Sequence, residues 1–416
     1  MNTNLDGRTP LVLVAGVSGS AAGTARSLLR TGTVVVHHDL SHLREGVVRR
    51  TVTSIAGNTV SEREAILELA HGCVSCTLSH DVLPLLRRLH SRSSVQRIVL
   101  LLDPELEPEA LCWAIEHIAV VGVVGQLDGP ALRDVRVEAV VTCIDAETWL
   151  ADATGDETFD IDSESDRTIA QVVVGQVEFA DALVVRGSEN LDSWQRSRLN
   201  AVLTRLAPGA PVRDDGGNVE DMLLAVPPDA RRGELTDAHS PLLRRQPSLD
   251  ESSGVVLVEF TANRPFHPGR LHEAIDVLLD GVVCSRGRLW LATQPGEALW
   301  LESAGGGLRV ASADTWLAAM TAERFERVPP ERRALAALKW DERFGDRDTS
   351  MVVLVCDGNP LEIDRALQYA LVTDEELADE KSWTSWEDPF GEFHEDPCEE
   401  SESSYVETES IREGNE

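Results

Sequence analysis

The first 225 residues alternate short apolar runs with stretches of helical periodicity. The apolar runs are rich in Val, Leu and Ile and are about one strand long; they span Leu11–Ala15, Thr33–His37, Arg97–Leu102, Val137–Ile144 and Ala182–Val185. Helical spacing is found over Ala21–Arg30, Glu62–Leu69, Asp81–Leu89 and Pro108–Val120. Because strand-like runs alternate with helical ones, the pattern predicts an α/β domain over residues 1–225, with a parallel sheet covered by helices on both faces.

A second domain is predicted after a segment without periodicity. Residues 226–253 hold Pro, Asp, Arg and Ser in no regular pattern, which predicts a linker. Beyond it, strand patterns cover Gly254–Phe260, Arg288–Ala292, Ala298–Ala304 and Met351–Val355. Helical patterns cover Pro268–Leu279 and Pro360–Leu371. This mixture predicts a smaller α+β domain over residues 254–377.

The composition changes near the end of the chain. Residues 374–416 contain 17 acidic residues against Lys381 and Arg412, and apolar periodicity is lost after Leu377. We therefore predict that residues 378–416 form an acidic disordered tail. Such a tail either solubilises the protein or serves as a docking arm for a basic partner.

The formal net charge of the whole chain is -33. Affinity for nucleic acid depends on Lys and Arg side chains that neutralise phosphates, so this charge opposes direct binding of RNA or DNA. It favours a basic protein or a metal ion as partner. One alternative is a local RNA contact by an arginine patch made of Arg324, Arg327, Arg332 and Arg333.

Apolar runs and cysteines indicate the compartment. No run approaches the roughly 20 apolar residues that a membrane-spanning helix needs, and the N-terminus lacks a charged-then-apolar leader pattern. The sequence thus predicts a cytoplasmic protein without a membrane segment. Its seven cysteines are an odd number and are widely spaced, which is typical of reduced thiols.

A glycine-rich turn, Gly16–Thr24, follows the first predicted strand and opens a helix. This is the context of a phosphate-binding P-loop, so the candidate nucleotide-binding residues are Gly16, Gly19, Ser20, Gly23 and Thr24. In the GxxxxGK[ST] pattern counted from Gly16, however, Ala22 stands where the lysine belongs. Three interpretations remain: a tight turn without ligand, weak phosphate binding, and true nucleotide turnover. No residue is assigned a catalytic role.

Two cysteines, Cys73 and Cys76, form a CxxC segment just before a helical run. Two thiolates at this spacing can chelate one soft divalent ion, and the missing ligands could come from the histidines His37, His38, His71 and His80. A structural pair of thiols and a thioredoxin-like redox pair are the alternatives.

In their order along residues 10–377, several segments resemble the CobW-like family of P-loop GTPases and metallochaperones. Beside the P-loop and the CxxC segment, these are Val140–Ala146, Gln176–Val185, Leu206–Pro211, Arg264–Leu271, Ser285–Ala292, and the stretch from Gly345–Arg347 to Thr373–Glu376. The Arg-rich and Lys-poor composition is similar to the actinobacterial zinc-starvation branch of the family. The resemblance implies a P-loop NTPase-like domain followed by a CobW-like C-terminal domain.

The resemblance also implies a function and marks where this chain departs from the family. In the family, an NKxD motif recognises guanine, and its position in this chain is occupied by Arg186–Glu189. The acidic residue expected after the third strand is Asp103. These departures and Ala22 argue against GTP as a bound cofactor and predict weak or lost hydrolysis. The family implies the handling of zinc or cobalt, often under zinc starvation, and zinc is the metal expected here.

Two functional hypotheses follow. One is an adaptor, linked to zinc starvation, that recruits a basic hibernation factor to the ribosome. The other is a GTP-dependent zinc metallochaperone. The ribosome and the hibernation factor are partners implied by resemblance alone.

Overall fold

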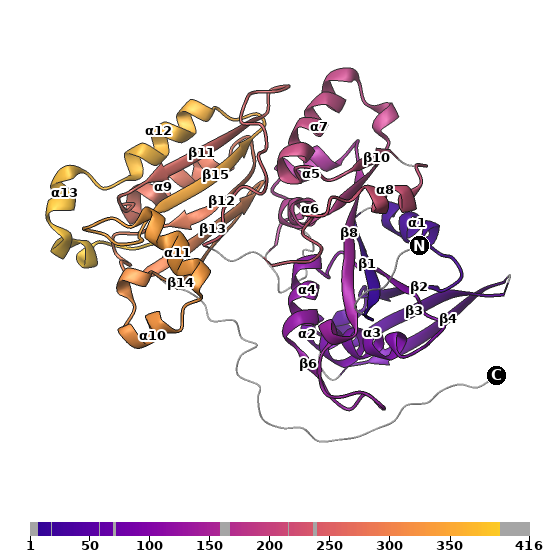
Figure 1. Ribbon diagram of the computed structural model, residues 1–416. Helices are drawn as coiled ribbons and strands as arrows, with labels where there is room; N and C mark the ends of the chain where they lie inside the picture. The colour runs from indigo at the N-terminus through magenta and orange to yellow at the C-terminus, as the bar shows by residue number, and fades with distance from the viewer. Residues whose placement is uncertain are drawn as a thin grey trace.

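The computed structural model describes residues 7–17, 19–57, 59–69, 72–158, 167–214, 216–235 and 239–391. The chain forms two lobes that lie side by side (Figure 1). The first lobe is built on an eight-stranded sheet with the order β10-β9-β8-β1-β5-β2-β3-β4. Its strands are β1 Thr9–Ala15, β2 Thr33–Asp39, β3 Val47–Ala56, β4 Thr59–Glu68, β5 Arg97–Leu101, β8 Val135–Asp145, β9 Ala182–Arg186 and β10 Val212–Asp214.

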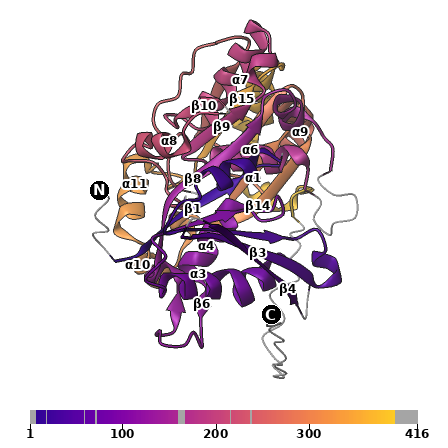
Figure 2. The same cartoon turned by 90° about the vertical axis from the view of Figure 1, so that its right-hand side faces the viewer.

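This sheet is mostly parallel, as the alternating pattern predicts. The six strands from β10 to β2 pair in parallel, whereas β3 and β4 add an antiparallel hairpin at one edge. Figure 2 shows the same sheet turned by 90°. The predicted fold class, an α/β sheet domain followed by a smaller α+β domain, is confirmed.

The prediction of a helix over Glu62–Leu69 is wrong, because this segment is strand β4. Glu and Leu favour helices in isolation, but that preference is weak and tertiary pairing overrides it. Here β4 pairs with β3 along its whole length, and Glu64 forms a cross-strand ion pair with Arg49 at 3.0 Å. The hairpin extends the carboxyl edge of the sheet, from which the CxxC segment leaves.

The helices of the first lobe cover both faces of the sheet. They are α1 Ser20–Ser27, α2 Val74–Thr77, α3 Leu83–His90, α4 Pro108–His117, α5 Trp149–Thr154, α6 Ile169–Glu178, α7 Ser193–Leu206 and α8 Val219–Ala225. Shorter elements are the 3-10 turns η1 Leu43–Glu45, η3 Ala131–Arg133 and η4 Ser188–Asn190, the π-helical turn η2 Leu78–Val82, and the two-stranded β6 Ala119–Val120 with β7 Gly129–Pro130.

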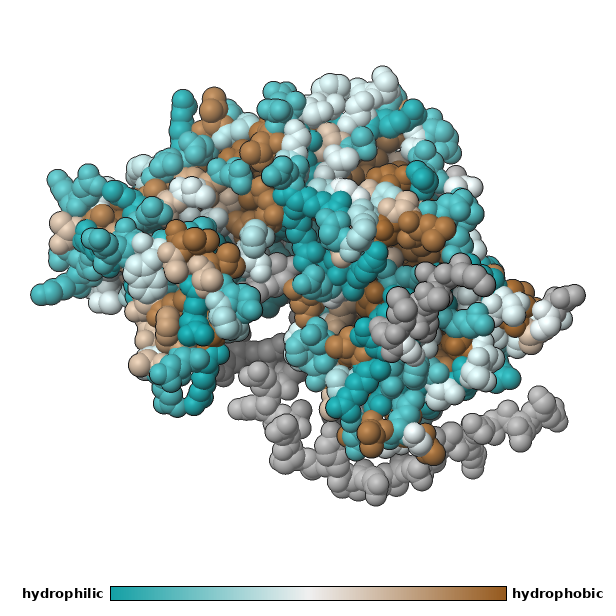
Figure 3. Space-filling model, viewed as in Figure 1, coloured by the Kyte–Doolittle hydropathy of each residue, from teal (hydrophilic) through white to brown (hydrophobic). Residues whose placement is uncertain are grey.

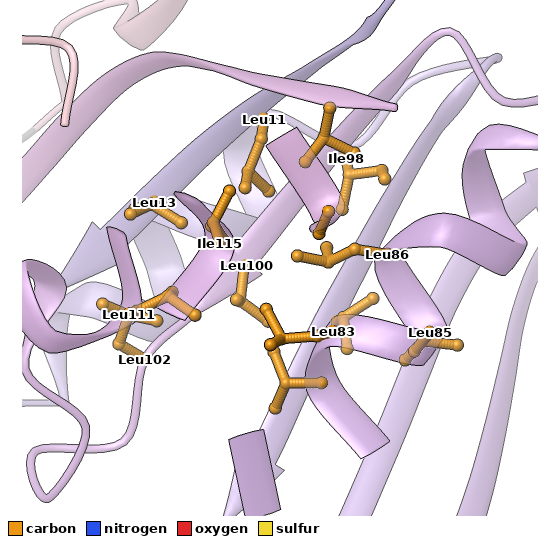
Figure 4. Packing of buried hydrophobic residues seen from close by; sticks show 14 of the residues in the cluster. Leu11, Leu13, Leu83, Leu85, Leu86, Ile98, Leu100, Leu102, Leu111 and Ile115 are labelled. Atoms are coloured by element: carbon orange, nitrogen blue, oxygen red, sulfur yellow. The ribbon is translucent and has the colours of Figure 1, made fainter. Parts of the chain in front are cut away.

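Alternate side chains of β1 point to the two opposite faces of the sheet. Leu11 and Leu13 point toward α3 and α4 and form one core with Ile98, Leu83 and Leu111 (Figure 4). Val12 and Val14 face the other way and pack against α1 and α8. Successive side chains of a strand point to opposite faces, so a strand covered on both sides must be apolar throughout, as this one is.

The second lobe is a five-stranded antiparallel sheet with the order β11-β15-β12-β13-β14. Its strands are β11 Val256–Ala262, β12 Val282–Leu289, β13 Glu297–Ala304, β14 Gly307–Thr315 and β15 Thr349–Val355. Its helices are α9 Pro268–Leu279, α10 Ala322–Glu326, α11 Pro330–Lys339, α12 Pro360–Ala370 and α13 Asp374–Ala378, with 3-10 turns η5 Leu317–Ala319 and η6 Glu380–Ser385. The strand predicted over Arg288–Ala292 corresponds to β12, which begins earlier in the chain, at Val282, and ends at Leu289. Pairing with β13 and β15 sets these bounds.

One hydrophobic core joins the two lobes. It contains Val202 and Leu206 of α7 from the first lobe and Val283 and Leu354 of β12 and β15 from the second. The turn between β13 and β14 also reaches across, where the Gly306 N–H donates to the Gly155 carbonyl at 2.9 Å. The described parts of residues 226–253, predicted as a linker, run along this junction.

The acidic segment begins as ordered structure. Residues 380–385 form η6, and Trp383 is buried with its ring 6.4 Å from that of Trp290. The prediction of disorder from residue 378 is therefore wrong for residues 378–391, because a buried aromatic ring anchors them. Residues 392–416 lie outside the described residues. Among the described residues, no helix has the length and apolar character needed to span a membrane.

Candidate functional site

The predicted P-loop connects β1 to α1 at the carboxyl edge of the sheet. Gly16 has φ of +152°, and a Cβ at this position would lie 2.7 Å from the carbonyl oxygen of Cys143. Only glycine fits this turn, because the chain passes so close to β8. Gly19 caps α1 without a side-chain hydrogen bond, whereas Ser18 lies outside the described residues.

The side chains of α1 do not supply a charged phosphate ligand. Ala22 and Gly23 are exposed, and Ser20 is buried. Thr24 is also buried, and its hydroxyl accepts a hydrogen bond from the thiol of Cys143 at 3.2 Å. Thr24 therefore faces the sheet, on the same side of α1 as Ala25.

The space beside the loop is small. A pocket of about 100 Å³ lies against Val17, Cys143, Asp145 and Trp149. Ligand pockets for drug-sized molecules usually measure about 300–1,000 Å³. This pocket is therefore smaller than a usual small-molecule site.

The other two nucleotide-linked positions have structural partners. The carboxylate of Asp103 accepts from the backbone N–H of Leu40 and of Glu105, both at 3.1 Å, and so ties the ends of β2 and β5 together. In the NKxD slot, Ser188 donates to Asp214 at 2.6 Å. Gly187 has φ of +70°, and no described side chain of this slot reproduces the Asn-Lys pair.

The CxxC segment follows β4 and opens the short helix α2. Cys73 caps the helix, and its Sγ accepts from the backbone N–H of Cys76 at 3.3 Å. Both side chains are partly exposed. A Cβ at Gly72 would lie 2.0 Å from the Leu43 carbonyl oxygen, so the chain passes against η1 with no room for a side chain. This places the two thiols at the carboxyl edge of the sheet, the edge that also carries the P-loop.

The histidines considered as further ligands differ in their surroundings. His38 is buried and its Nε2 lies 2.8 Å from Asp81, whereas His80 is exposed on η2. Burial lowers the pKa of His37. His71 lies outside the described residues. Among the described residues, no group of three or more potential metal ligands is present.

Asp81 is a buried residue that the sequence patterns did not single out. It lies on the π-helical turn η2, five residues after Cys76, and its carboxylate contacts both His38 and Arg50. A π turn inserts an extra residue into a helix and often occurs near functional sites. Here it turns the acid toward β2 and β3, and thereby fixes the helix that carries the CxxC segment to the sheet.

The arginine patch considered for RNA contact is largely engaged within the protein. Arg327 forms an ion pair with Glu323 at 2.6 Å, and Arg332 pairs with Asp314. Arg333 lies 5.9 Å from the centre of the Phe325 ring. Of the four arginines, Arg324 is the one whose exposed side chain has no such contact with a described residue.

A strand–loop–helix unit at the carboxyl edge of a mostly parallel sheet, with an antiparallel lobe attached, defines a P-loop NTPase-like protein. Residues 38–214 match the family described as CobW/HypB/UreG, nucleotide-binding domain, and residues 255–371 match the Cobalamin synthesis protein cobW C-terminal domain. The chain belongs to the CobW family. The first match begins after the loop Gly16–Thr24, where this chain departs from the P-loop pattern.

Individual relatives extend the comparison. Zinc chaperone Rv0106 of Mycobacterium tuberculosis is 50% identical over 393 residues, which cover 94% of this chain and 95% of the relative. Zinc-regulated GTPase metalloprotein activator 1 of Dictyostelium discoideum is 22% identical over 410 residues, which cover 92% and 84%. The crystal structure of the Zn(II)-bound YjiA GTPase from E. coli shares 14% identity at a TM-score of 0.37, covering 88% of this chain and 99% of that chain. At this score the structural likeness carries no argument about the site.

Proposed function

We propose that this protein is a zinc chaperone of the CobW family that holds a zinc ion as cargo through Cys73 and Cys76. The observation that carries the proposal is the placement of both thiols on the first turn of α2, where Cys73 Sγ accepts from the Cys76 N–H at 3.3 Å. Thiolates are among the ligands that zinc prefers. The name of the 50% identical relative, Zinc chaperone Rv0106, supports the same metal.

A site with two thiolates suits transfer better than storage. Structural zinc sites are closed by four protein ligands, whereas a site with open positions accepts ligands from another molecule. The partly exposed thiols at the edge of the sheet leave such positions open to an acceptor. An acceptor protein would take the ion by exchanging its own ligands for Cys73 and Cys76.

In this proposal the nucleotide contributes little. Stabilisation of transferring phosphate by a fixed positive charge is usually a large catalytic effect, and Ala22 has no charge to offer. Thr24 would have to leave its hydrogen bond with Cys143 to reach a magnesium ion. We therefore propose that the chaperone acts without appreciable GTP hydrolysis.

The ribosome adaptor remains the second proposal. Its support is the net charge of -33, which favours a basic partner. The names of the relatives above mention zinc and do not mention the ribosome. Removal of residues 392–416 tests the docking role of the tail and leaves the buried Trp383 in place. Association with ribosomes that survives this truncation argues against tail docking.

Zinc handover tests the chaperone proposal. The protein is loaded with one equivalent of zinc and mixed with the apo form of a zinc enzyme, whose recovered activity is followed with and without GTP. We expect handover by the wild type and by the control Cys112→Ala, which removes a buried thiol, and no stoichiometric loading of the Cys73→Ser/Cys76→Ser variant. Handover that depends on GTP hydrolysis would support a chaperone but contradict nucleotide independence.

A further inference from the structure

The junction between the two lobes holds a charged pocket that is remote from the CxxC segment in the sequence and shares no lining residue with it. Its volume is about 420 Å³, which is within the usual range for small-molecule sites. Residues of α4 and α6, of segment 226–253 and of β12, β13 and β14 line it. Hydrophilic residues border the junction on the face seen in Figure 3. A ligand in this pocket would touch both lobes.

Two arginine doublets direct side chains into this pocket. In each doublet the first residue, Arg231 or Arg244, lines the pocket, whereas the second, Arg232 or Arg245, has a left-handed backbone with φ of 47° or 58°. Such φ values are strained for residues other than glycine and persist where the surroundings impose them, often at ligand clamps.

Buried Asp181 imposes the first of these turns. Its carboxylate accepts from the Arg232 N–H at 2.9 and 3.1 Å and from the Val140 N–H at 2.9 Å, which ties segment 226–253 to β8. Arg245 is held in turn by an ion pair with Asp229 at 2.5 Å. Both anchors hold the second arginine of a doublet, whereas the first lines the pocket.

Arg231 has both acidic neighbours, Glu109 and Glu178, and basic neighbours, Arg244 and Arg286. Glu178 is neutralised by Arg286 at 2.8 Å, and Arg286 also donates to the Leu242 carbonyl at 2.9 Å. Arg231 forms no ion pair with any described carboxylate; its guanidinium lies 4.6 Å from the centre of the Phe179 ring. Burial and the neighbouring Arg244 lower the pKa of Arg231 to about 10. A bound anion would supply a counter-charge that offsets both the desolvation of Arg231 and its repulsion by Arg244.

We propose that the pocket between the lobes binds a small anionic molecule, held through a phosphate or carboxylate group by Arg231 and Arg244. Guanidinium groups donate two parallel hydrogen bonds to either kind of anion, which accounts for the choice of arginine. The acids Glu109 and Glu302 also line the pocket, and burial raises the pKa of both, so they give up their charge more readily than exposed carboxylates. Ligand binding would join segments of the two lobes.

Calorimetric titration of the full chain at low salt tests this site, with inorganic phosphate in one arm and citrate in the other. We expect the wild type to bind at least one anion saturably. The Arg231→Gln/Arg244→Gln variant should bind it at least about tenfold more weakly, because charge-assisted hydrogen bonds are lost. Arg324→Gln, on an exposed helix of the second lobe, is the matched control and should bind as the wild type does. Binding in one arm only assigns the ligand to phosphate-bearing or carboxylate-bearing molecules.

A second variant covers the case in which the double variant fails to fold. Ala313→Glu places a carboxylate on the β14 wall of the pocket and should weaken the same anion without touching the doublets. Absence of binding in both arms overturns the proposal. Phosphate binding that stays unchanged in the double variant and in Ala313→Glu also overturns it, because the ion then lies elsewhere, for instance at the loop after β1. Neither result bears on zinc handling.

Discussion

The hydroxyl of Thr24 lies 3.2 Å from the thiol of Cys143, so the residue nearest to the Ser/Thr position of a P-loop is hydrogen-bonded to the neighbouring strand. The turn Gly16–Thr24 keeps the glycine that its tight path requires. Ala22 stands at the position of the P-loop lysine and Gly23 at that of the metal-binding Ser/Thr, and the adjacent Thr24 is buried. The described part of the turn thus offers no charged side chain in the place of the P-loop lysine.

From this relationship we predict negligible GTP hydrolysis. Purified protein should release phosphate at the same low rate as its Thr24→Ala variant, because neither offers a lysine to the transferring phosphate. Thr24→Ser, which keeps a hydroxyl, is the matched control for folding. Steady turnover by the wild type that Thr24→Ala abolishes would show that the hydroxyl can reach the nucleotide after all.

The contact between Asp81 and Arg50 gives a stability prediction. Asp81→Asn should destabilise the protein by about 3 kcal/mol, because it leaves the guanidinium of Arg50 without a counter-charge in a largely buried place. The free energy of unfolding in urea measures the effect. Asp364→Asn, an exposed acid on α12, should change it by less than about 0.5 kcal/mol. Equal effects of the two substitutions would contradict a special role for Asp81.

The ion pair between Glu376 and Arg270 predicts a dependence of stability on pH. Hydrogen bonds from Arg270, together with those of Thr373, lower the pKa of Glu376 from 4.5 to about 2. A carboxyl whose pKa is lowered by folding stabilises the protein above its unfolded pKa, and this contribution is lost as pH falls from about 4.5 to about 2. Glu376→Gln should therefore be less stable than the wild type at pH 7 by about 1–2 kcal/mol.

The difference between these two proteins should narrow as the solution is acidified below pH 4.5. Glu375→Gln removes the neighbouring exposed acid and serves as the control, with a small effect at either pH. Chemical denaturation at a series of pH values is the measurement. A difference between wild type and Glu376→Gln that is the same at pH 7 and pH 3 would rule out the linkage.

Zinc affinity should also fall on acidification. Zinc binds the deprotonated thiolate, so protons compete with the metal for Cys73 and Cys76. Titration of the wild type with zinc at pH 8 and at pH 6 should show weaker binding at the lower pH. Affinity that is independent of pH over this interval would point to ligands other than thiols.

The sequence was sufficient for the fold because burial alone defines its main elements. Strands such as β1 and β5 are apolar on both faces, and α9 was predicted with the bounds that it has. The edge strand β4 was missed because its residues suit a helix and its only partner is β3. The pairing is a hairpin that is local in the sequence, from Ala56 and Thr59 at the turn to Val47 and Glu68 at the far end, so the helix-forming residues of β4 hid it.

The site was only partly predictable, because several of its contacts join residues that are far apart in the sequence. The spacing of Cys73 and Cys76 places them on one turn, and there the backbone N–H of Cys76 donates to Cys73 Sγ. Sequence distance could not show that His38 is bound to Asp81, nor that Thr24 is turned toward Cys143. The arginine doublets fell in a segment without periodicity, where strained backbone and an anchor such as Asp181 leave no repeating pattern.

The central claim, that Cys73 and Cys76 hold zinc, is tested most directly by competition with a chelating dye. Wild-type protein and the Cys112→Ala control should each withdraw one equivalent of zinc from the dye at neutral pH. The Cys73→Ser/Cys76→Ser variant, if folded as judged by circular dichroism, should withdraw none. Unchanged stoichiometry and affinity in that variant would contradict the assignment and would place the metal at other residues of the chain.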